Sequence, residues 1–309
     1  MKTTEASAAG APLSGMVNAM SVDVEDYFHV ASLAESIDRA RWDDMEYRAE
    51  ANTRLLLDLF DEFRVKSTFF VLGWVARRSP ALIREIHDRG HEVASHGMSH
   101  KLVYNQTLEE FTSETRESKK LLEDIIGASV LGYRASTYSI TKRSLWALDV
   151  LVEAGFEYDS SIFPIRHDLY GIPDAPLVPT RIPTPKGASI VEFPMSTAPF
   201  FGMKLPVSGG GYFRLLPYWL TRAGLRKLNH SLGRPFVFYL HPWEVDPAQP
   251  RVRASWKSQL RHYTNLEHTA SRLRELLGEF RFAPLRTVLG TTQLMPADPR
   301  PLAAGTLAR

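Results

Sequence analysis

The sequence predicts an α/β protein whose core is a mainly parallel sheet. From residue 16 onward, short apolar runs typical of buried strands alternate with longer segments that carry apolar residues at helical spacing. A strict strand-then-helix order is typical of parallel sheets, either open or closed into a barrel. The length of 309 residues and the composition, 44% apolar and 23% charged, fit one enlarged globular domain of this class.

The first half of the chain supplies most of this alternation. Pro80 stands at the first position of one expected helix, and Gly127 stands where another should stop. Thr107 and Glu110 form a capping box at the start of that second helix. The expected strands are residues 16–24, 67–72, 91–95 and 129–133. The expected helices lie within residues 45–64, 79–90, 107–127 and 141–154.

The alternation is interrupted after residue 160. Nine prolines occur between residues 161 and 211, and this stretch ends in Gly209-Gly210-Gly211. Because long structureless loops are uncommon inside compact domains, we expect a packed Pro/Gly-rich insertion with short strands over about 161–235. Regularity then returns, with an expected strand over residues 236–240, a helix over 265–280 and a final strand over 287–290.

The two ends of the chain differ in composition from the rest. Residues 1–15 are small and polar, and residues 296–309 are rich in Ala and Pro, so we expect a disordered leader and a flexible tail around a single domain over 16–295. The N-terminus lacks the basic and apolar regions of a secretory signal, and no apolar run approaches the roughly 20 residues that cross a bilayer. These features predict a cytoplasmic protein without a transmembrane segment.

The composition excludes several classes of protein. The chain contains no cysteine, which excludes disulfide scaffolds, thiolate zinc sites, iron–sulfur clusters and cysteine nucleophiles. Its 37 basic residues nearly balance its 35 acidic ones, which argues against a general electrostatic grip on nucleic acid or anionic lipid. Neither a serine-hydrolase elbow nor a phosphate-binding loop motif occurs. Any metal site must therefore use imidazole and carboxylate ligands.

The first chemical motif is the acidic cluster Asp23-Val24-Glu25-Asp26, where the first expected strand ends. Residues i and i+2 of a strand point the same way, so Asp23 and Glu25 could share one side of the sheet edge. Two carboxylates held together suit a divalent metal plus a general base. The alternative is an ordinary acidic loop or helix N-terminus.

The second motif is His96-Gly97-Met98-Ser99-His100, which follows another expected strand. On a helix, this spacing places two imidazoles one turn apart, the geometry that holds Zn²⁺ in helical sites. A second pair with the same spacing, His87 and His91, is interrupted by Gly90 at an expected helix end. We therefore take the first pair as the candidate and the second as a chance occurrence.

Two further motifs also follow expected strands. Arg134, in Gly132-Tyr133-Arg134, could hold a carboxylate through a bidentate pair or could be an ordinary surface arginine. His241 follows the most apolar expected strand of the chain, in the run L-H-P-W-E. This position suits a general acid, with a structural histidine as the alternative.

Taken in order, these segments resemble the polysaccharide deacetylase (NodB homology) family. The matching segments are the acidic cluster, S-T-F-F-V-L-G, S-H-G-M-S-H, G-Y-R, Y-D-S-S and L-H, and they extend from Asp23 to His241. The runs S-V-D-V-E-D-Y-F-H-V, G-G-G-Y-F-R-L-L-P and H-P-W-E-V-D look more narrowly like the branch associated with exosortase and exopolysaccharide loci. The resemblance implies a distorted (β/α) barrel of the NodB homology type.

The resemblance also implies a set of metal ligands. His96 and His100 match the two histidine ligands of the family, and a divalent metal is implied, with Zn²⁺ expected. The family's second aspartate is replaced by Val24, so Glu25 is our choice for the carboxylate ligand and Asp26 stays open as the alternative.

The catalytic roles follow from the same resemblance. Asp23 matches the base that takes a proton from water, and Arg134 matches the arginine that orients this base. His241 matches the histidine that protonates the leaving amine, and Asp159 in Y-D-S-S matches the acid that orients His241.

The function that these roles imply is N-deacetylation of N-acetylhexosamine units in an exopolysaccharide or its precursor. The implied partners are the glycan substrate and the exopolysaccharide biosynthesis machinery, with no nucleic acid. Two alternatives stay open at this point. One is a C–N hydrolase of a small amide, such as a ureide or cyclic imide, on the same fold. The other is a non-catalytic glycan-binding or assembly protein.

Overall fold

The computed structural model describes residues 15–295 of the chain. The expected leader, apart from residue 15, and the expected tail over 296–309 lie outside the described residues. Within residues 15–295, none of the helices combines the length and the apolar character needed to cross a bilayer.

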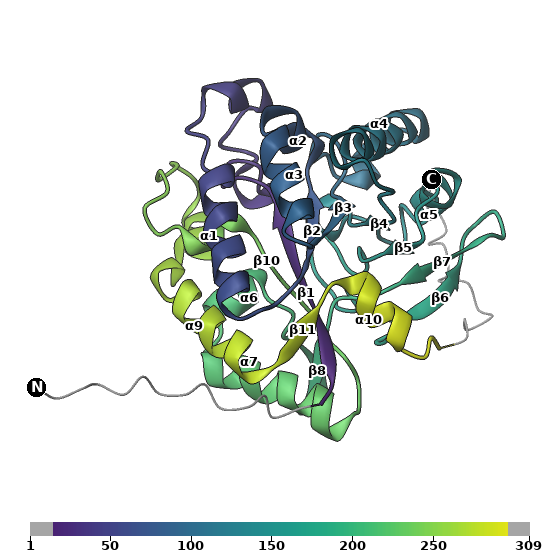
Figure 1. Cartoon of the computed structure of the whole chain (residues 1–309), viewed down its shortest axis with the longest axis vertical. Coiled ribbons are helices and arrows are strands. Elements are labelled where there is room, and N and C mark those ends of the chain that lie inside the picture. Colours follow the sequence, from purple (N-terminus) through teal and green to yellow (C-terminus); the bar gives the residue numbers. More distant parts are fainter. Residues whose placement is uncertain (1–14, 296–309) are drawn as a thin grey trace, which may run out of the picture.

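A nine-stranded sheet forms the centre of the molecule (Figure 1). All strand pairs of this sheet are parallel except the pair Thr180–Pro183 with Ser189–Glu192, and the strand Arg281–Ala283 pairs with the beginning of Val17–Val24. A separate antiparallel hairpin consists of β8 (Thr197–Phe200) and β9 (Met203–Pro206). In spatial order the strands of the large sheet are β10 (Val237–Leu240), β1 (Val17–Val24), β2 (Thr68–Val71), β3 (Glu92–Ser95), β4 (Gly132–Tyr133), β5 (Tyr158–Asp159), β7 (Ser189–Glu192) and β6 (Thr180–Pro183), with β11 (Arg281–Ala283) on β1.

Helices connect the strands and cover the sheet, with α1 to α4 over strands β1 to β4 (Figure 1). Two short 3₁₀ turns, η4 (Ser136–Tyr138) and η6 (Pro242–Val245), follow β4 and β10. The α-helices are α1 (Ala49–Glu62), α2 (Gly73–Arg78), α3 (Pro80–Asp88), α4 (Leu108–Ile126), α5 (Ala147–Glu153), α6 (Gly210–Leu215), α7 (Tyr218–Arg226), α8 (Trp256–Tyr263), α9 (Leu266–Glu279) and α10 (Leu285–Thr291).

The central strand β1 separates apolar and functional residues between its two faces. Met20, Val22 and Val24 belong to the large apolar core that the helices cover. Ser21 and Asp23 alternate with them and point to the opposite face, because successive side chains of a strand point to opposite sides. Burial of the first face fixes the register of β1, and this register places Asp23 in the interior of the other face.

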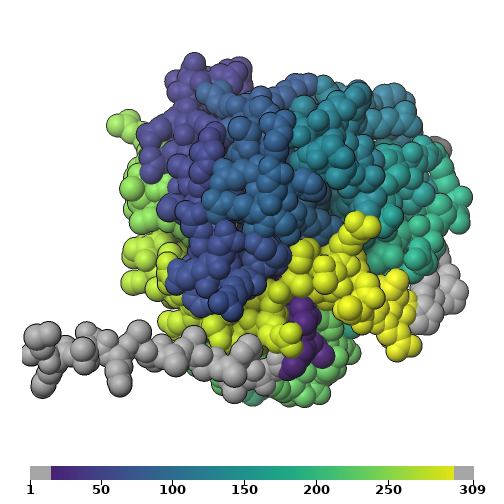
Figure 2. All heavy atoms as spheres, viewed as in Figure 1, coloured from purple at the N-terminus to yellow at the C-terminus, as the bar shows by residue number. Residues whose placement is uncertain are grey.

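The predicted α/β class and parallel sheet are confirmed, and most of the predicted elements form near their expected positions. The prediction of a strand over residues 287–290 is wrong, because these residues belong to α10. Leu285 and Val288 are buried at helical spacing after Pro284, and the last strand is β11, earlier in the chain. Figure 2 shows this C-terminal segment, in yellow, packed against the beginning of β1, in purple.

The helix predicted over residues 141–154 forms only in its second half. The Ser144 hydroxyl accepts a hydrogen bond from the Thr141 backbone N–H at 2.9 Å and donates one to the Ser139 carbonyl at 2.8 Å. These bonds hold a turn, and α5 begins only at Ala147. A serine that binds the neighbouring backbone competes in this way with the helical hydrogen bonds.

The Pro/Gly-rich segment, expected as an insertion over about 161–235, packs into the fold. It contributes β7 and β6 to one edge of the large sheet, and it also forms the β8–β9 hairpin, α6 and α7. At its end, Gly209 makes a parallel bridge with Tyr239 of β10, and the Tyr239 backbone N–H donates to the Ser208 carbonyl at 2.7 Å. The glycine run therefore brings α6 directly against β10.

Two substitutions in this glycine run should have different effects on stability, because one glycine lies against the backbone of β10 and the other is on an open part of α6. Gly209 has a φ of +115°, and a Cβ there would lie 1.9 Å from the Tyr239 carbonyl oxygen. Gly209→Ala should therefore lower the free energy of unfolding by at least about 2 kcal/mol. Gly211 lies in α6 with no heavy atom within 4 Å of the added Cβ, so Gly211→Ala should be neutral or stabilising by up to about 1 kcal/mol. Urea denaturation measures both changes, and equal destabilisation by the two variants would contradict a specific need for glycine at position 209.

Candidate metal and catalytic site

The candidate site lies at the carboxyl edge of the parallel sheet. Strands β1, β3 and β10 end immediately before or within the acidic cluster, the His96 segment and His241. Since these strands are parallel neighbours or next neighbours, their carboxyl ends share one edge, where α/β folds place their sites. A pocket of about 200 Å³ opens there, and its lining includes Asp23, Glu25 and His241.

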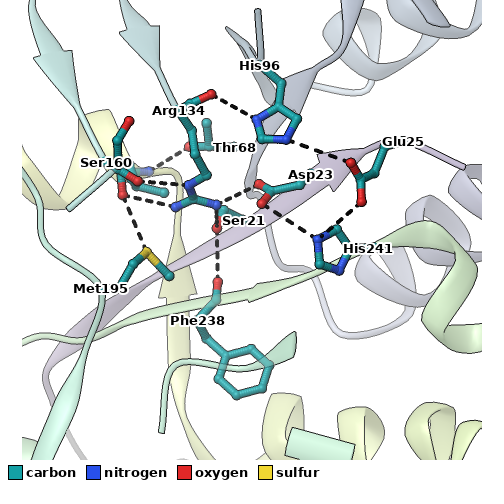
Figure 3. Close-up of polar contacts among 12 residues, drawn as sticks. Ser21, Asp23, Glu25, Thr68, His96, Arg134, Ser160, Met195, Phe238 and His241 are labelled. Carbon is teal, nitrogen blue, oxygen red and sulfur yellow. Dashed lines mark hydrogen bonds and ion pairs between the residues drawn. The ribbon is translucent and has the colours of Figure 1, made fainter. Parts of the chain in front are cut away.

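Three buried side chains of this pocket form a group that could hold a metal ion. The ligand atoms of Glu25, His96 and His100 all lie within 4.8 Å of one another. Glu25 Oε2 is 2.5 Å from His100 Nε2 and 3.9 Å from His96 Nε2, and Figure 3 shows the last pair facing each other. Glu25 Oε2 is buried without a hydrogen bond of acceptable geometry. A buried carboxylate oxygen facing two imidazole nitrogens fits a divalent cation, because such an oxygen otherwise stays unsatisfied.

The His96 ring is prepared for metal binding by its other nitrogen. Its Nδ1–H donates to the backbone carbonyl of Arg134 at 2.8 Å, which leaves the Nε2 lone pair facing Glu25. Burial is the main cause that lowers the pKa of His96 to about 4, so the ring is neutral near pH 7. A neutral imidazole whose second nitrogen is fixed by a hydrogen bond is the usual state of a metal-ligating histidine.

The Glu25 carboxylate is ionised despite its burial. Burial by itself raises the pKa of Glu25, but the rings of His100, His241 and His96 together hold it well below its usual range. The indole N–H of Trp243 also donates to Glu25 Oε1 at 3.5 Å. Glu25 therefore offers a charged oxygen at a fixed position.

The two histidines come together through a loop and not through a helix, contrary to the geometry expected from their spacing. Gly97 has a φ of 75° and His100 a φ of 57°, and the residues between β3 and η3 (Val103–Asn105) form no helix. Left-handed conformations at these two positions fold the loop back, so that the ring centroids of His96 and His100 lie 5.5 Å apart.

The structure also distinguishes Glu25 from Asp26, which the sequence left open. The Asp26 carboxylate accepts hydrogen bonds from the backbone N–H groups of Tyr27 at 2.8 Å, Arg48 at 2.6 Å and Ala49 at 2.7 Å. The last two groups are at the beginning of α1, so Asp26 caps this helix. Burial raises the pKa of Asp26 to about 6, although these three bonds oppose the shift. Its oxygens are thus committed to the backbone.

Arg134 lies fully buried beneath the pocket and holds Asp23. Its Nη1 donates to Asp23 Oδ1 at 2.7 Å and to the Ser21 hydroxyl at 2.8 Å (Figure 3). Its Nε and Nη2 donate to the carbonyl and hydroxyl oxygens of Ser160 at 3.1 and 3.0 Å, and the guanidinium lies 4.0 Å from the Phe70 ring centre. This pairing fixes Asp23 through Oδ1, while Oδ2 faces His241.

His241 reaches the same point from β10. Its Nε2 lies 3.5 Å from Glu25 Oε1 and 4.0 Å from Asp23 Oδ2 (Figure 3). Its Nδ1 is 2.7 Å from Glu244 Oε1. Burial opposes the charged ring, but the charge of Glu25, the hydrogen bond and charge of Glu244, and the charge of Asp23 raise the pKa of His241 to about 9. A cation on Glu25 would weaken the largest of these favourable contributions.

The structure does not bring Asp159 together with His241, the residue that the resemblance implies it orients. Its Oδ1 accepts from the Ser161 hydroxyl at 2.5 Å, and the parallel register of β5 and β7 places it beside Glu192. Burial raises the pKa of Asp159 to about 6, and burial plus the charge of Asp159 raises that of Glu192 well above its usual value. Four strands separate β5 from β10 along the sheet, which is why this carboxyl lies away from the histidine.

The sequence interpretation missed Glu244, Arg214 and Trp243 as site residues. Glu244 Oε2 accepts from Arg214 Nε at 2.6 Å, and this guanidinium is the main cause that lowers the pKa of Glu244 to about 2 against the effect of burial. One signal was present, because Glu244 follows His241 by three residues, the spacing of a capping box. The structure contains that box, with the His241 backbone N–H donating to Glu244 Oε1 at 3.1 Å.

Two family models match successive parts of this chain. Residues 40–158 match the model described as polysaccharide deacetylase, and residues 160–290 match one described as domain of unknown function (DUF3473). The first match contains His96, His100 and Arg134, whereas the second contains His241 and Glu244. The side chains of one pocket therefore come from both matched segments.

Several curated relatives have names that describe glycan deacetylases. A peptidoglycan-N-acetylglucosamine deacetylase of Bacillus cereus is 31% identical over 71 residues, covering 23% of this chain and 33% of that protein. A peptidoglycan deacetylase of Helicobacter pylori is 28% identical over 116 residues, with 38% and 39% covered. A chitooligosaccharide deacetylase of Rhizobium leguminosarum bv. trifolii is 34% identical over 99 residues, with 32% and 43% covered. The chain thus spans less than half the length of these relatives.

Solved structures show the same fold. A protein from Mycobacterium smegmatis assigned to the polysaccharide deacetylases superposes with a TM-score of 0.59 at 22% identity, over 93% of this chain and 96% of its own. The Puue allantoinase superposes with a TM-score of 0.55 at 16% identity, over 87% of each chain. By the family-model match and by the relatives alike, this chain is similar to polysaccharide deacetylases.

Metal binding should depend on Glu25 and not on Asp26. Glu25→Gln removes the charged oxygen that faces both imidazoles, and we expect it to weaken Zn²⁺ binding by more than about 100-fold, since changes in outer contacts alone cost 10–100-fold. Asp26→Asn should keep the metal and lower the free energy of unfolding by about 1–2 kcal/mol through the weakened helix cap. Metal content after dialysis, measured by mass spectrometry, and urea denaturation check the two outcomes. If only Asp26→Asn lost the metal, Asp26 and not Glu25 would be the carboxylate ligand.

Proposed function

We propose that this protein is a metal-dependent N-deacetylase that removes acetyl groups from N-acetylhexosamine units of a glycan. The observation that carries the proposal is that one pocket brings a Glu25–His96–His100 group together with two groups suited to proton transfer, Asp23 and His241. The names of the curated relatives support acetylated amino sugars as the substrate class.

The ligand set supports a catalytic zinc site. Glu25, His96 and His100 would hold the ion with one carboxylate and two imidazoles, the number of protein ligands typical of catalytic zinc sites. When bound, a divalent ion of this kind lowers the pKa of water and polarises an amide carbonyl. The residues of the chain then have two tasks: to take a proton from the attacking water, and to give a proton to the departing nitrogen.

Asp23 is placed to accept the first proton. Arg134 occupies Asp23 Oδ1, so Oδ2 is the oxygen available to the pocket, and it lies 4.0 Å from His241 Nε2. As water adds to the acetyl carbonyl carbon, this oxygen takes a water proton. The buried guanidinium keeps the carboxylate in one orientation, which a general base requires.

His241 is placed to deliver a proton at the end of the reaction. Its Nε2 faces Asp23 and Glu25, while its Nδ1 is held by Glu244. The protonated ring gives the Nε2 proton to the departing nitrogen as the C–N bond breaks. The products are acetic acid, which ionises in water, and the free amine of the hexosamine. The water proton held on Asp23 Oδ2 then passes to His241 Nε2, 4.0 Å away, which returns both groups to their starting states.

The wall of the pocket supports a sugar as the bound group. His167 and Tyr170 stack with their ring centres 3.8 Å apart and an angle of 11°, and both line the pocket with Tyr138 and Tyr239. Flat aromatic surfaces of this kind suit the apolar face of a hexose. We further propose that the glycan is an exopolysaccharide or its precursor, which the three sequence runs that resemble that branch support.

Activity should follow the proposed site residues. The Zn²⁺-loaded protein should release acetate from N-acetylated chitooligosaccharide, and Asp23→Asn and His96→Ala should each lower kcat/KM by about 10²–10⁴-fold. His87→Ala is the matched control, because His87 belongs to the other H-x-x-x-H pair and lies on α3. It should keep kcat/KM within about threefold. Acetate release with and without chelator is the measurement.

The substrate class is tested with the same protein. The protein would instead be a small-amide hydrolase if it hydrolysed a small ureide or cyclic imide and released no acetate from any glycan. The Puue allantoinase has a similar fold. Full activity of Asp23→Asn and His96→Ala would contradict the mechanism. A protein that binds glycan, but neither retains Zn²⁺ nor hydrolyses the glycan when Zn²⁺ is supplied, would support a binding protein instead.

A further inference from the structure

We propose that Glu244, held by Arg214, is the residue that positions His241 for proton delivery, in the place that the resemblance implied for Asp159. The inference rests on the proposed deacetylase function. It assigns a task to the segment that matches the domain of unknown function, because His241, Glu244 and Arg214 all lie within residues 160–290.

The first contact is the one between Glu244 and the histidine ring. Glu244 Oε1 accepts from His241 Nδ1 at 2.7 Å and from the His241 backbone N–H at 3.1 Å. His241 is the N-cap of the short turn η6 and Glu244 lies within it, and Pro242 restricts the backbone between them. With Nδ1–H bound to the carboxylate, Nε2 is the nitrogen that faces Asp23 and the pocket.

The second contact holds the carboxylate itself. Arg214 Nε donates to Glu244 Oε2 at 2.6 Å, and the two side chains are 2% and 1% exposed. The remaining guanidinium hydrogens are directed at backbone carbonyls, with His262 accepting at 2.8 Å, Arg261 at 3.0 Å and Thr264 at 3.1 Å. A guanidinium fixed by three carbonyls cannot follow the carboxylate if it moves, so it defines where Glu244 lies.

The glycine run explains how Arg214 arrives under η6. Gly209 touches the backbone of Tyr239, and a Cβ on Gly210 would lie 2.2 Å from the Tyr239 hydroxyl oxygen. This approach sets the beginning of α6 against Tyr239 of β10, which precedes His241 by two residues. Arg214 is on the following turn of α6. The glycines of the run G-G-G-Y-F-R therefore allow the close approach that places Arg214 next to Glu244.

Stacking restrains the histidine ring on its face. The rings of His241 and Trp243 are 5.1 Å apart at 18°, and those of Trp243 and His262 are 4.3 Å apart at 16°. His262 in turn has its Nε2 2.7 Å from Gln249 Oε1. The hydrogen bond to Glu244 therefore selects the orientation of a ring that the stack already confines to one plane.

The variant Glu244→Gln tests the inference because it preserves shape and removes one acceptor. Both His241 Nδ1–H and Arg214 Nε–H donate to Glu244, and a glutamine amide offers only one oxygen to two donors. One of the two donors must then face the NH₂ group of the glutamine, to which it cannot donate. Glu244→Asp keeps both acceptors on a shorter side chain and serves as the conservative variant.

The deciding measurement compares two leaving groups in the Zn²⁺-loaded protein. N-acetylated chitooligosaccharide must have its amine protonated as the C–N bond breaks, whereas 4-nitrophenyl acetate loses a stable phenolate that needs no proton. Glu244→Gln should lower kcat on the amide by about 100-fold with KM within about threefold, and lower kcat on the ester by less than about threefold. Glu244→Asp should recover part of the lost kcat on the amide. Asp159→Asn, the competing assignment, should show no dependence on the leaving group.

A second readout does not depend on activity. In ¹⁵N-histidine spectra of the metal-free protein, the Nδ1 proton of His241 should give a protected downfield signal that His241→Ala removes and Glu244→Gln removes or shifts upfield. Circular dichroism verifies that each variant is folded. An unchanged signal in Glu244→Gln, equal losses on amide and ester, or leaving-group dependence in Asp159→Asn would each overturn the inference. A wild-type protein that releases no acetate from any glycan contradicts the proposed function instead, while the histidine spectra still test Glu244.

Discussion

The site depends above all on the buried guanidinium of Arg134. A cation without exposure to solvent is costly unless it is paired and fully hydrogen-bonded, and here Asp23, Ser21 and Ser160 provide the partners. Its backbone takes part as well: the carbonyl accepts from His96 Nδ1, and the N–H donates to the Ser95 carbonyl at 2.9 Å. One residue thus orients both the proposed proton acceptor and a candidate metal ligand, so a shift of β4 would disturb the two together.

Buried carboxyl groups near this sheet edge have different tasks because their neighbours differ. Glu25 faces imidazoles and stays charged, whereas Asp26 accepts from the backbone at the start of α1. Glu244 is held as an anion by a guanidinium. Asp159 has another carboxyl group beside it, and its pKa is raised to about 6 by burial. Similar side chains in similar burial therefore differ in chemistry according to which donors surround them.

The pocket also shows why two successive sequence segments form one site. β10 pairs with β1 in parallel, with Leu240 opposite Val22, so the residues that follow these two, His241 and Asp23, are neighbours at the sheet edge. His241 consequently lies beside Asp23, although more than 200 residues separate them along the chain. The segment with the polysaccharide deacetylase match supplies His96, His100 and Arg134, and the following segment supplies the histidine and the groups around it.

The sequence by itself determined the α/β class and most strands and helices, because apolar periodicity is local. It also indicated that Asp23, His96 and His241 come together, because each lies at or just after the end of a strand and parallel strands end at one edge. Only the tertiary structure decided that Asp26 caps a helix, that a left-handed loop joins His96 to His100, and that Glu244 rather than Asp159 meets His241. Those choices depend on strand order and on donors from distant segments, such as Arg214 on α6, and a hydrogen bond between remote residues leaves no periodic trace in the sequence.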